Sequence, residues 1–394
     1  MRISVLGGFG LMAEAALHDL ASNPRVTRIY AADLNLARAK NVLAKIPNRK
    51  KIRPVKTDIT DTALALRALK GSQCVLNCAW YEFNLKAMDL ALALKAHYVD
   101  LGGLYHTTLK QLKRSEQFRK AELLGALGCG STPGITNMMV ARMAEGFEEV
   151  ESVGIYDASH DPSLSEAEFL PPFSIRTMLD EFEKPAPILR DGRIREVPAH
   201  SAQEELDFAQ PIGRVAAGAV IHSEAATLPA YLRKKGVRDL FFKIAYPESV
   251  KRQLALLAGM GLSKDSPIQV NGAAVSPRHF VTALAQRSAL GASCAQTPRD
   301  FEVLRVRMAG RRHGRPLLKV WDCEIRPTRL LSAGTAGVGF PGAIAASMLC
   351  GGKTLMAAGV GAPESVLAAE AFFKELKARR VFSLIETLAH PLAL

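Results

Sequence analysis

The sequence predicts an α/β chain in which a doubly wound parallel sheet is followed by a second, α+β domain with a mostly antiparallel mixed sheet. Short apolar strands alternate with helices over residues 2–101, as is typical of parallel βαβ units. A glycine-rich turn joins the first strand to the first helix. From Glu149 onward, alternating strands and a hairpin signal replace that pattern. The first part is therefore expected to be a Rossmann-type domain.

The turn at residues 7–13 fits the dinucleotide fingerprint G-x-G-x-x-[GA], with Gly8, Gly10 and Ala13 at its small positions. It follows an apolar strand over residues 2–6 and precedes a helix that begins near Leu11. Glycines let backbone N–H groups approach a pyrophosphate, and the helix dipole favours its negative charge. We therefore expect a group of residues in this turn to contact the cofactor: Gly7, Gly8, Phe9, Gly10, Leu11 and Met12.

Asp33 ends the second apolar strand, residues 26–32, about 20 residues beyond the glycines. An acid at this position accepts from the ribose hydroxyls of the adenosine and repels a 2′-phosphate, so it favours NAD. Arg38 and Lys40 follow on the next helix, and they leave NADP possible. The competing interpretation is a glycine turn followed by an ordinary capping aspartate.

The alternation continues with strands at 51–57, 73–79 and 97–101 and helices at 36–46, 61–69, 84–96 and 107–124. A short sixth strand is expected at 126–129. Because ligands of such sheets lie beyond the carboxyl ends of the strands, the residues just after each strand are candidates. Asp58, Ala79 and Gly102 are expected beside the cofactor, and Tyr81, Asp100 and Gly103 beside the substrate.

We predict a dinucleotide-binding domain over residues 1–130, a substrate-binding and dimerisation domain over 131–333, and C-terminal helices over 334–394 that pack back on the nucleotide domain. The second domain has strand patterns at 150–156, 218–223, 240–245, 301–308 and 317–325, and a helix pattern at 277–290. Residues 187–197 predict a hairpin around Asp191-Gly192.

The amino-acid composition limits the kinds of protein to which this chain can belong. The 394 residues, 48% of them hydrophobic, suffice for two or three domains. The net charge of +13 raises the possibility of nucleic acid, but no aromatic residues are interleaved with the basic runs, so we expect none. No apolar run of about 18 residues and no signal core are apparent, which predicts a cytoplasmic protein without membrane contact. The six cysteines form no C-x-x-C pair, so no metal site is expected.

Several ordered stretches together resemble the saccharopine dehydrogenase superfamily, and most closely its bacterial lysine 6-dehydrogenases. They cover nearly the whole chain: residues 5–12, 77–84, 99–103, 133–137, 222–229, 275–278 and 337–341. The resemblance implies NAD(P)-linked oxidation of an amine on an amino acid, and a homodimer. The chain departs from relatives at Thr132, where some carry an acid, and at Asp157-Ala158, where Gly-Gly is expected.

Hydride removal from a carbon bound to nitrogen leaves an iminium ion that water hydrolyses, so the site needs a base and donors for a carboxylate. We expect Asp100, Tyr81 and His222 to be catalytic, with His222 on the strand at 218–223. The motifs of the resemblance add candidate substrate-binding residues: Gly103, Pro133, Gly134, Asn137, Glu224 and Thr227. For each of them, capping, turn formation or core packing is the competing interpretation.

The expected function is NAD(P)-dependent oxidative deamination of the lysine ε-amine, with a small amino acid as substrate. Oxidation of a secondary amine, as in saccharopine, or the reverse reductive coupling would use the same groups. A non-catalytic NAD(P)H sensor is the alternative from another class.

Overall fold

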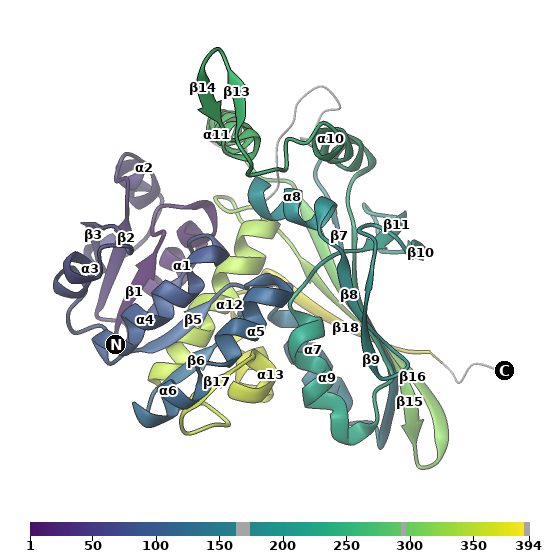
Figure 1. Ribbon diagram of the computed structural model, residues 1–394. Coiled ribbons are helices and arrows are strands. Elements are labelled where there is room, and N and C mark those ends of the chain that lie inside the picture. Colours follow the sequence, from purple (N-terminus) through teal and green to yellow (C-terminus); the bar gives the residue numbers. More distant parts are fainter. Residues whose placement is uncertain (163–173, 293–296, 390–394) are drawn as a thin grey trace.

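The structure is a computed structural model that describes residues 1–162, 174–292 and 297–389. Its first layer is a seven-stranded, all-parallel sheet in the order β17-β6-β5-β4-β1-β2-β3 (Figure 1). The strands are β1 (Arg2–Leu6), β2 (Arg28–Asp33), β3 (Ile52–Lys56), β4 (Cys74–Asn77), β5 (His97–Asp100), β6 (Leu124–Ala126) and β17 (Gly359–Gly361). The strand order reverses between β1 and β4, as in the Rossmann fold, so the predicted fold class is confirmed.

Helices flank this sheet: α1 (Leu11–Ser22), α2 (Ala39–Ala44), α3 (Thr62–Ala68), α4 (Asn84–Leu94), α5 (Leu104–Leu112) and α6 (Ser115–Lys120), with 3-10 turns η1 (Arg49–Lys51) and η2 (Tyr81–Phe83). The single helix expected over residues 107–124 is wrong: α5 and α6 divide this stretch, and Glu122 adopts a positive φ of 56°. Leu124 then begins β6 and donates to His97 Nδ1, so strand pairing ends the helix early.

The second layer is a nine-stranded mixed sheet whose main path is β10-β11-β12-β7-β15-β16-β18. Its strands are β7 (Glu149–His160), β8 (Ala186–Arg190), β9 (Arg193–Val197), β10 (Glu204–Asp207), β11 (Arg214–Ala219), β12 (Asp239–Ala245), β15 (Phe301–Arg312), β16 (Arg315–Ile325) and β18 (Phe382–Ala389). Only β7 and β12 run parallel within it, which confirms the mostly antiparallel sheet. The hairpin turn at Asp191-Gly192 has positive φ at both residues, as a type I′ turn requires.

The helices of the second lobe are α7 (Ile135–Ala144), α8 (Ile175–Glu183), α9 (Glu224–Leu232), α10 (Glu248–Gly259) and α11 (Pro277–Ala292), with η3 (Arg233–Lys235). A small hairpin of β13 (Ile268–Val270) and β14 (Ala273–Val275) projects with α11 at the top of Figure 1. The strand expected over 218–223 is wrong in extent, because β11 ends at Ala219 and His222 lies in the loop before α9.

Residues 334–389 connect both layers. Helix α12 (Ala333–Cys350) packs against α1, β4 and β5, and Gly339 permits the close approach, since a Cβ there would lie 2.5 Å from the Met12 carbonyl oxygen. The helices α13 (Pro363–Val366) and α14 (Ala369–Ala378) follow. Helices alone were expected here, but β17 joins the parallel sheet and β18 joins the mixed sheet.

Helix α12 is long and apolar enough to cross a membrane by length and composition. However, 78% of it is buried within this protein, between the two layers, as expected for a core helix. Its apolar side chains belong to one hydrophobic cluster that extends from α1 and β1 to β7 and β15. This shared core holds the two sheets in a fixed relation to one another.

Candidate active site

The glycine loop after β1 forms a tight backbone turn. Gly7 has a φ of +65°, and a Cβ on Gly8 would lie 2.8 Å from the Ala31 carbonyl carbon on β2. The Gly10 N–H donates to the Gly7 carbonyl, and no side chain caps α1 at Gly10. The first N–H groups of α1, from Leu11 onward, therefore have neither a preceding turn nor a side-chain cap to bond to. This arrangement fits the pyrophosphate of a dinucleotide.

Asp33 lies next to this loop at the end of β2. Its Oδ2 accepts from the Phe9 N–H at 3.0 Å, and its Oδ1 accepts from the Asn35 N–H at 3.0 Å. Both bonds orient the carboxylate, and each oxygen keeps a second lone pair for a ribose hydroxyl. Asp58 differs, because its Oδ1 accepts from both the N–H and the hydroxyl of Thr60, which lowers the pKa of Asp58. Asp58 thus stabilises its own turn.

Polar side chains join the ends of β4 and β5. The Ala79 N–H donates to Asn77 Oδ1, and Asn77 Nδ2 donates to Asn84 Oδ1 at 2.8 Å. Asn84 in turn donates to the Gly102 carbonyl. Gly103 packs against the same network, since a Cβ there would lie 2.6 Å from Gln111 Oε1. These bonds fix the loops that line the crevice at the strand ends.

Asp100 is buried at 1% exposure beneath those loops. Its Oδ1 accepts from the N–H groups of Gly128 at 2.7 Å and Gly102 at 3.0 Å, and its Oδ2 accepts from Gln111 Nε2 at 2.6 Å. Burial raises the pKa of Asp100, although the hydrogen bonds from these donors act in the opposite direction. With both oxygens engaged inside the fold, Asp100 has the geometry of a positioning residue.

The Pro133-Gly134 loop packs on the end of β5. A Cβ on Gly128 would lie 2.7 Å from Pro133 Cγ, and one on Gly134 would lie 2.0 Å from the Gly130 carbonyl oxygen. The Gly130 N–H donates to the Pro133 carbonyl at 2.8 Å. Gly134, with a φ of +137°, therefore has no room for a side chain. The loop is a rigid wall between the two lobes.

Asn137 opens α7 directly after that wall. Its Oδ1 accepts from the Gly134 N–H at 3.1 Å, and its Nδ2 donates to Glu364 Oε2 at 3.0 Å and to Thr227 Oγ1 at 3.4 Å. Burial raises the pKa of Glu364 to about 7. The amide of Asn137 is thus used between α7, α9 and α13, so Asn137 and Thr227 support the wall from behind.

His222 is buried in the loop before α9, and its Nδ1 is hydrogen-bonded to Glu224 Oε2. Thr136 donates to the other oxygen of Glu224 at 3.2 Å. The imidazole stacks on Phe242, with ring centroids 3.9 Å apart. Although burial lowers the pKa of His222, the Glu224 carboxylate together with Glu181 and Asp157 raises it above its ordinary value.

Two further carboxyl groups, the buried Glu181 and the half-buried Asp157, lie within electrostatic reach of His222. Asp157 is inside β7, and Glu181 on α8 accepts from the Tyr246 hydroxyl. Burial raises the pKa of both groups to about 7. Groups that titrate near neutral pH in a crevice are typical of proton-transfer sites. Sequence reasoning missed Glu181, whereas it marked Asp157 as a departure from the family motif and as a possible site residue.

These pKa values predict a pH-dependent stability. The folded protein holds protons on Glu181 and Asp157 that the unfolded chain releases near pH 4, so the free energy of unfolding should fall from about pH 4.5 to about pH 7 and level off above it. Urea unfolding across this range measures the slope. Glu181→Gln should reduce the slope, whereas Gln at the exposed Glu370 should not. An equal slope in the Glu181 variant would contradict the buried titration.

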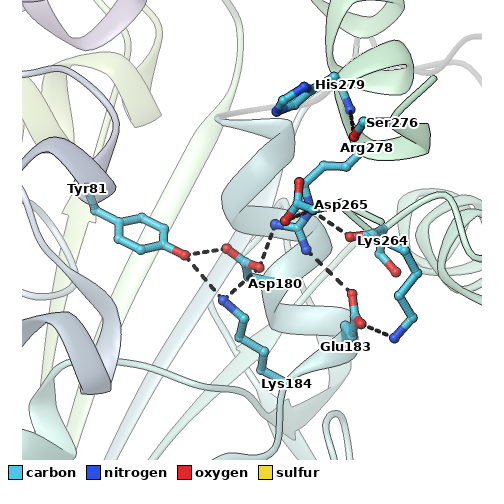
Figure 2. A network of polar contacts seen from close by, with 10 residues as sticks. Tyr81, Asp180, Glu183, Lys184, Lys264, Asp265, Ser276, Arg278 and His279 are labelled. Atoms are coloured by element: carbon cyan, nitrogen blue, oxygen red, sulfur yellow. Dashed lines mark hydrogen bonds and ion pairs between the residues drawn. The ribbon is translucent and has the colours of Figure 1, made fainter. Parts of the chain in front are cut away.

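Tyr81 reaches from η2 across the crevice to α8 (Figure 2). Its hydroxyl donates to Asp180 Oδ2 at 2.5 Å, and Lys184 Nζ lies 3.0 Å from Asp180 Oδ1. Arg278 of α11 donates to the same Oδ1 at 2.7 Å. Burial, followed by the Asp180 charge, raises the pKa of Tyr81 far above its ordinary value. Tyr81 therefore remains a protonated donor that ties the nucleotide domain to the second lobe.

Trp80 and Arg176 face one another across the same crevice. The Arg176 guanidinium carbon lies 4.5 Å from the centroid of the Trp80 ring. Trp80 Nε1 and Arg176 Nε are both buried without a hydrogen-bond partner among the described residues. Two unpaired buried donors, one of them cationic, suit a carboxylate. Arg176 was missed because no local pattern marks it, and only the fold brings α8 to the end of β4.

The structure brings part of the predicted set together where the two lobes meet, because Tyr81 and Ile221, the residue before His222, pack in one hydrophobic cluster. On the nucleotide side the glycine loop is bonded to Asp33, and in the second lobe His222 is paired with Glu224. Among the described residues, no cluster of three or more His, Cys, Asp or Glu side chains has a geometry that could hold a metal ion. The loop geometry fits the pyrophosphate of a dinucleotide and defines a dinucleotide-binding protein of the Rossmann class.

Comparison with known protein families specifies the class. Residues 3–124 match the saccharopine dehydrogenase NADP binding domain, and residues 130–381 match the saccharopine dehydrogenase C-terminal domain. The chain belongs to the saccharopine dehydrogenase family, as its motifs indicated, and it binds NAD(P).

Two relatives illustrate the range of the family. The chain is 22% identical over 298 residues, 72% of either protein, to carboxyaminopropylagmatine dehydrogenase of Synechocystis. It superimposes with a TM-score of 0.73 on saccharopine dehydrogenase (L-Glu forming) from Saccharomyces cerevisiae, with 17% identity, covering 98% of this chain and 99% of that one. At this identity the structural match supports the fold, while the substrate is a separate question.

Proposed function

We propose that this protein oxidises a C–N bond in an amino-acid substrate that carries a carboxylate and an amine, with NAD(P) as hydride acceptor. The observation that carries the proposal is a pair of poles of opposite character where the two lobes meet, since Trp80 packs in one cluster with Ile221, the residue before His222. Trp80 and Arg176 present unpaired donors, while His222, Glu224, Asp157 and Glu181 form an acidic, proton-exchanging pole. A carboxylate suits the first pole and an amine the second.

The dinucleotide would be held by the loop from Gly7 to Met12 and by Asp33. When bound, the dinucleotide would supply a hydride acceptor for the oxidation of the substrate carbon. His222 would hold the amine neutral by taking its proton. Pairing of Nδ1 with Glu224 leaves Nε2 as the nitrogen that exchanges the proton, and the carboxylate stabilises the resulting imidazolium. Asp100 would act indirectly by fixing the Gly102 loop.

Two substrates fit this chemistry. The motif resemblance favours the primary ε-amine of lysine. A secondary amine is favoured by the relatives, one named for saccharopine and the other for an agmatine derivative bearing carboxy and aminopropyl groups. We give the secondary amine precedence, because both named relatives share the fold or most of the sequence span with this chain.

Absorbance at 340 nm tests these substrates directly. Purified protein would receive NAD or NADP with lysine, saccharopine or carboxyaminopropylagmatine, and the reverse reaction would be followed with the reduced cofactors. The highest kcat/KM is expected with a secondary amine. A higher value for lysine would restore the ε-amine assignment. Saturable cofactor binding without turnover of any amine would instead support the sensor alternative.

Asp33 is expected to set the choice of cofactor in favour of NAD. Asp33→Ser removes the repulsion of a 2′-phosphate, so the ratio of kcat/KM for NADP to that for NAD should rise by at least about tenfold. Steady-state rates with both cofactors measure the ratio. Asp58→Ser is the matched control, because that carboxylate bonds to Thr60 within its own turn. An unchanged ratio in Asp33→Ser would place the selectivity elsewhere.

A homodimer and a cytoplasmic location complete the proposal. Apolar side chains concentrate on the arm formed by α10, β13 and α11, where Leu256, Met260, Ile268, Val270 and Phe280 are all at least 45% exposed. Such a concentration is typical of an interaction surface. Light scattering after size exclusion measures the assembly, and Leu256→Glu with Phe280→Glu should shift it towards the monomer.

A further inference from the structure

A cavity of about 490 Å³ lies between α8, α10 and the turn at Ala199–His200. All of its lining residues come from the second lobe, so it is separate from the glycine loop. The rings of Phe182 and His200, with centroids 3.9 Å apart, form one wall, and the small side chains of Ala255 and Ala258 leave the space open. The volume is in the range of small-molecule sites.

The polar groups of the cavity are mainly donors. Lys251 and Lys264 line it, and Lys264 forms an ion pair with Glu183. Lys251 has no ion-pair partner within the described part of the chain. His200 Nε2 is buried and also lacks a hydrogen-bond partner there. Burial and the Lys251 charge lower the pKa of His200 to about 4, so the imidazole is neutral at pH 7 and can donate one hydrogen bond.

The wall is held in place by the surrounding elements. The His200 N–H donates to the Ala219 carbonyl at 2.7 Å, which fixes the turn to the end of β11. Tyr246 contacts the rings of both Phe182 and His200, and its hydroxyl donates to Glu181. The cavity is therefore preformed, and a ligand would lose little free energy to reorganisation of the protein.

We propose that this cavity binds a small organic anion, whose carboxylate or phosphate head contacts Lys251 and His200 and whose apolar body packs against Phe182 and Ala255. A buried donor without a partner is costly, and an anion between an ammonium and an imidazole N–H satisfies both groups. The inference does not depend on the reaction proposed above, because none of these residues belongs to the crevice.

Histidine ring NMR of the full chain tests the proposal. Spectra are recorded with saturating NAD, so that the dinucleotide site is filled, and the His200 signal is assigned by its loss in His200→Gln. Benzoate and phenyl phosphate are titrated as probes, with benzyl alcohol as the neutral analogue. We expect the anions to shift the His200 signal with a Kd of about 1–10 mM, and benzyl alcohol to bind at least tenfold more weakly. Binding of only one of the two anions would support the proposal and would identify carboxylate or phosphate as the preferred anionic group.

Matched variants separate this cavity from general attraction to a basic protein. Lys251→Met should weaken anion binding at least tenfold, whereas Lys374→Met removes the same charge from the exposed face of α14 and should not. Arg176→Met should leave the His200 titration unchanged, since that residue lies in the crevice. Equal weakening in the two lysine variants, equal binding of benzyl alcohol, or no saturable shift of His200 would each overturn the proposal.

Discussion

Replacing His222 with glutamine is expected to lower kcat for the amine substrate by about 10²–10⁴-fold, the usual contribution of a general base. The imidazole is the titratable group at the centre of the acidic pole, held by Glu224 and stacked on Phe242. Glutamine keeps a polar side chain but cannot take a proton. The rate at which reduced cofactor forms measures the loss of kcat. The Kd for NAD, measured by fluorescence, should change by no more than about twofold.

Controls distinguish lost proton transfer from lost folding. His313→Gln removes a surface imidazole that is 78% exposed in its side chain, and it should leave kcat unchanged. Glu224→Gln removes the carboxylate that raises the pKa of His222, so the acidic limb of the kcat/KM profile should move to lower pH. A His222→Gln variant that is folded, binds NAD and keeps most of its turnover would assign the base to another residue.

Replacing Arg278 with methionine is expected to lower the free energy of unfolding by about 3 kcal/mol. Arg278 is 4% exposed, and it donates to Asp180, which is fully buried. Methionine preserves much of the volume but leaves the Asp180 charge with only Tyr81 and Lys184 as partners. Urea denaturation followed by circular dichroism measures the change.

A double-mutant cycle isolates the interaction energy between Arg278 and Asp180. The double variant Asp180→Asn with Arg278→Met should lose clearly less free energy of unfolding than the sum of the losses in the two single variants. The reason is that no buried charge is then left uncompensated. Arg238→Met removes an exposed ion pair with Asp191 and should change stability little. Strict additivity within the cycle would show that the Arg278 effect is loss of packing alone.

The nucleotide half of the fold was predictable because its signals are local. The glycine loop carries its signal within residues 7–13, where Gly7 has a φ of +65°, and most of the parallel strands, such as β1, are short apolar runs. The helix expected over 107–124 failed because β6 pairs with β17, whose strand lies more than 230 residues further on. Such a pairing competes with helix propensity without leaving a local signal.

The candidate site was predictable only in part. His222 and Glu224 were found through the family motif, and the structure pairs them. Asp100 was expected to reach the substrate, but its oxygens are used by Gly102, Gly128 and Gln111, because a strand end can point into the loops as well as into the crevice. Its role in catalysis stays a prediction, now as a positioning residue.

The sequence by itself determined the first six strands of the parallel sheet, the dinucleotide loop and the family, since each is marked by short stretches of neighbouring residues, whereas β17 joins from a remote part of the chain. Only the tertiary structure decided which polar groups share the crevice. Arg176 meets Trp80, and Glu181 comes within electrostatic reach of His222, because α8 folds back over the end of β4. Their burial, and the pKa values that follow from it, depend on packing between elements that are remote in sequence, so no local pattern encodes them.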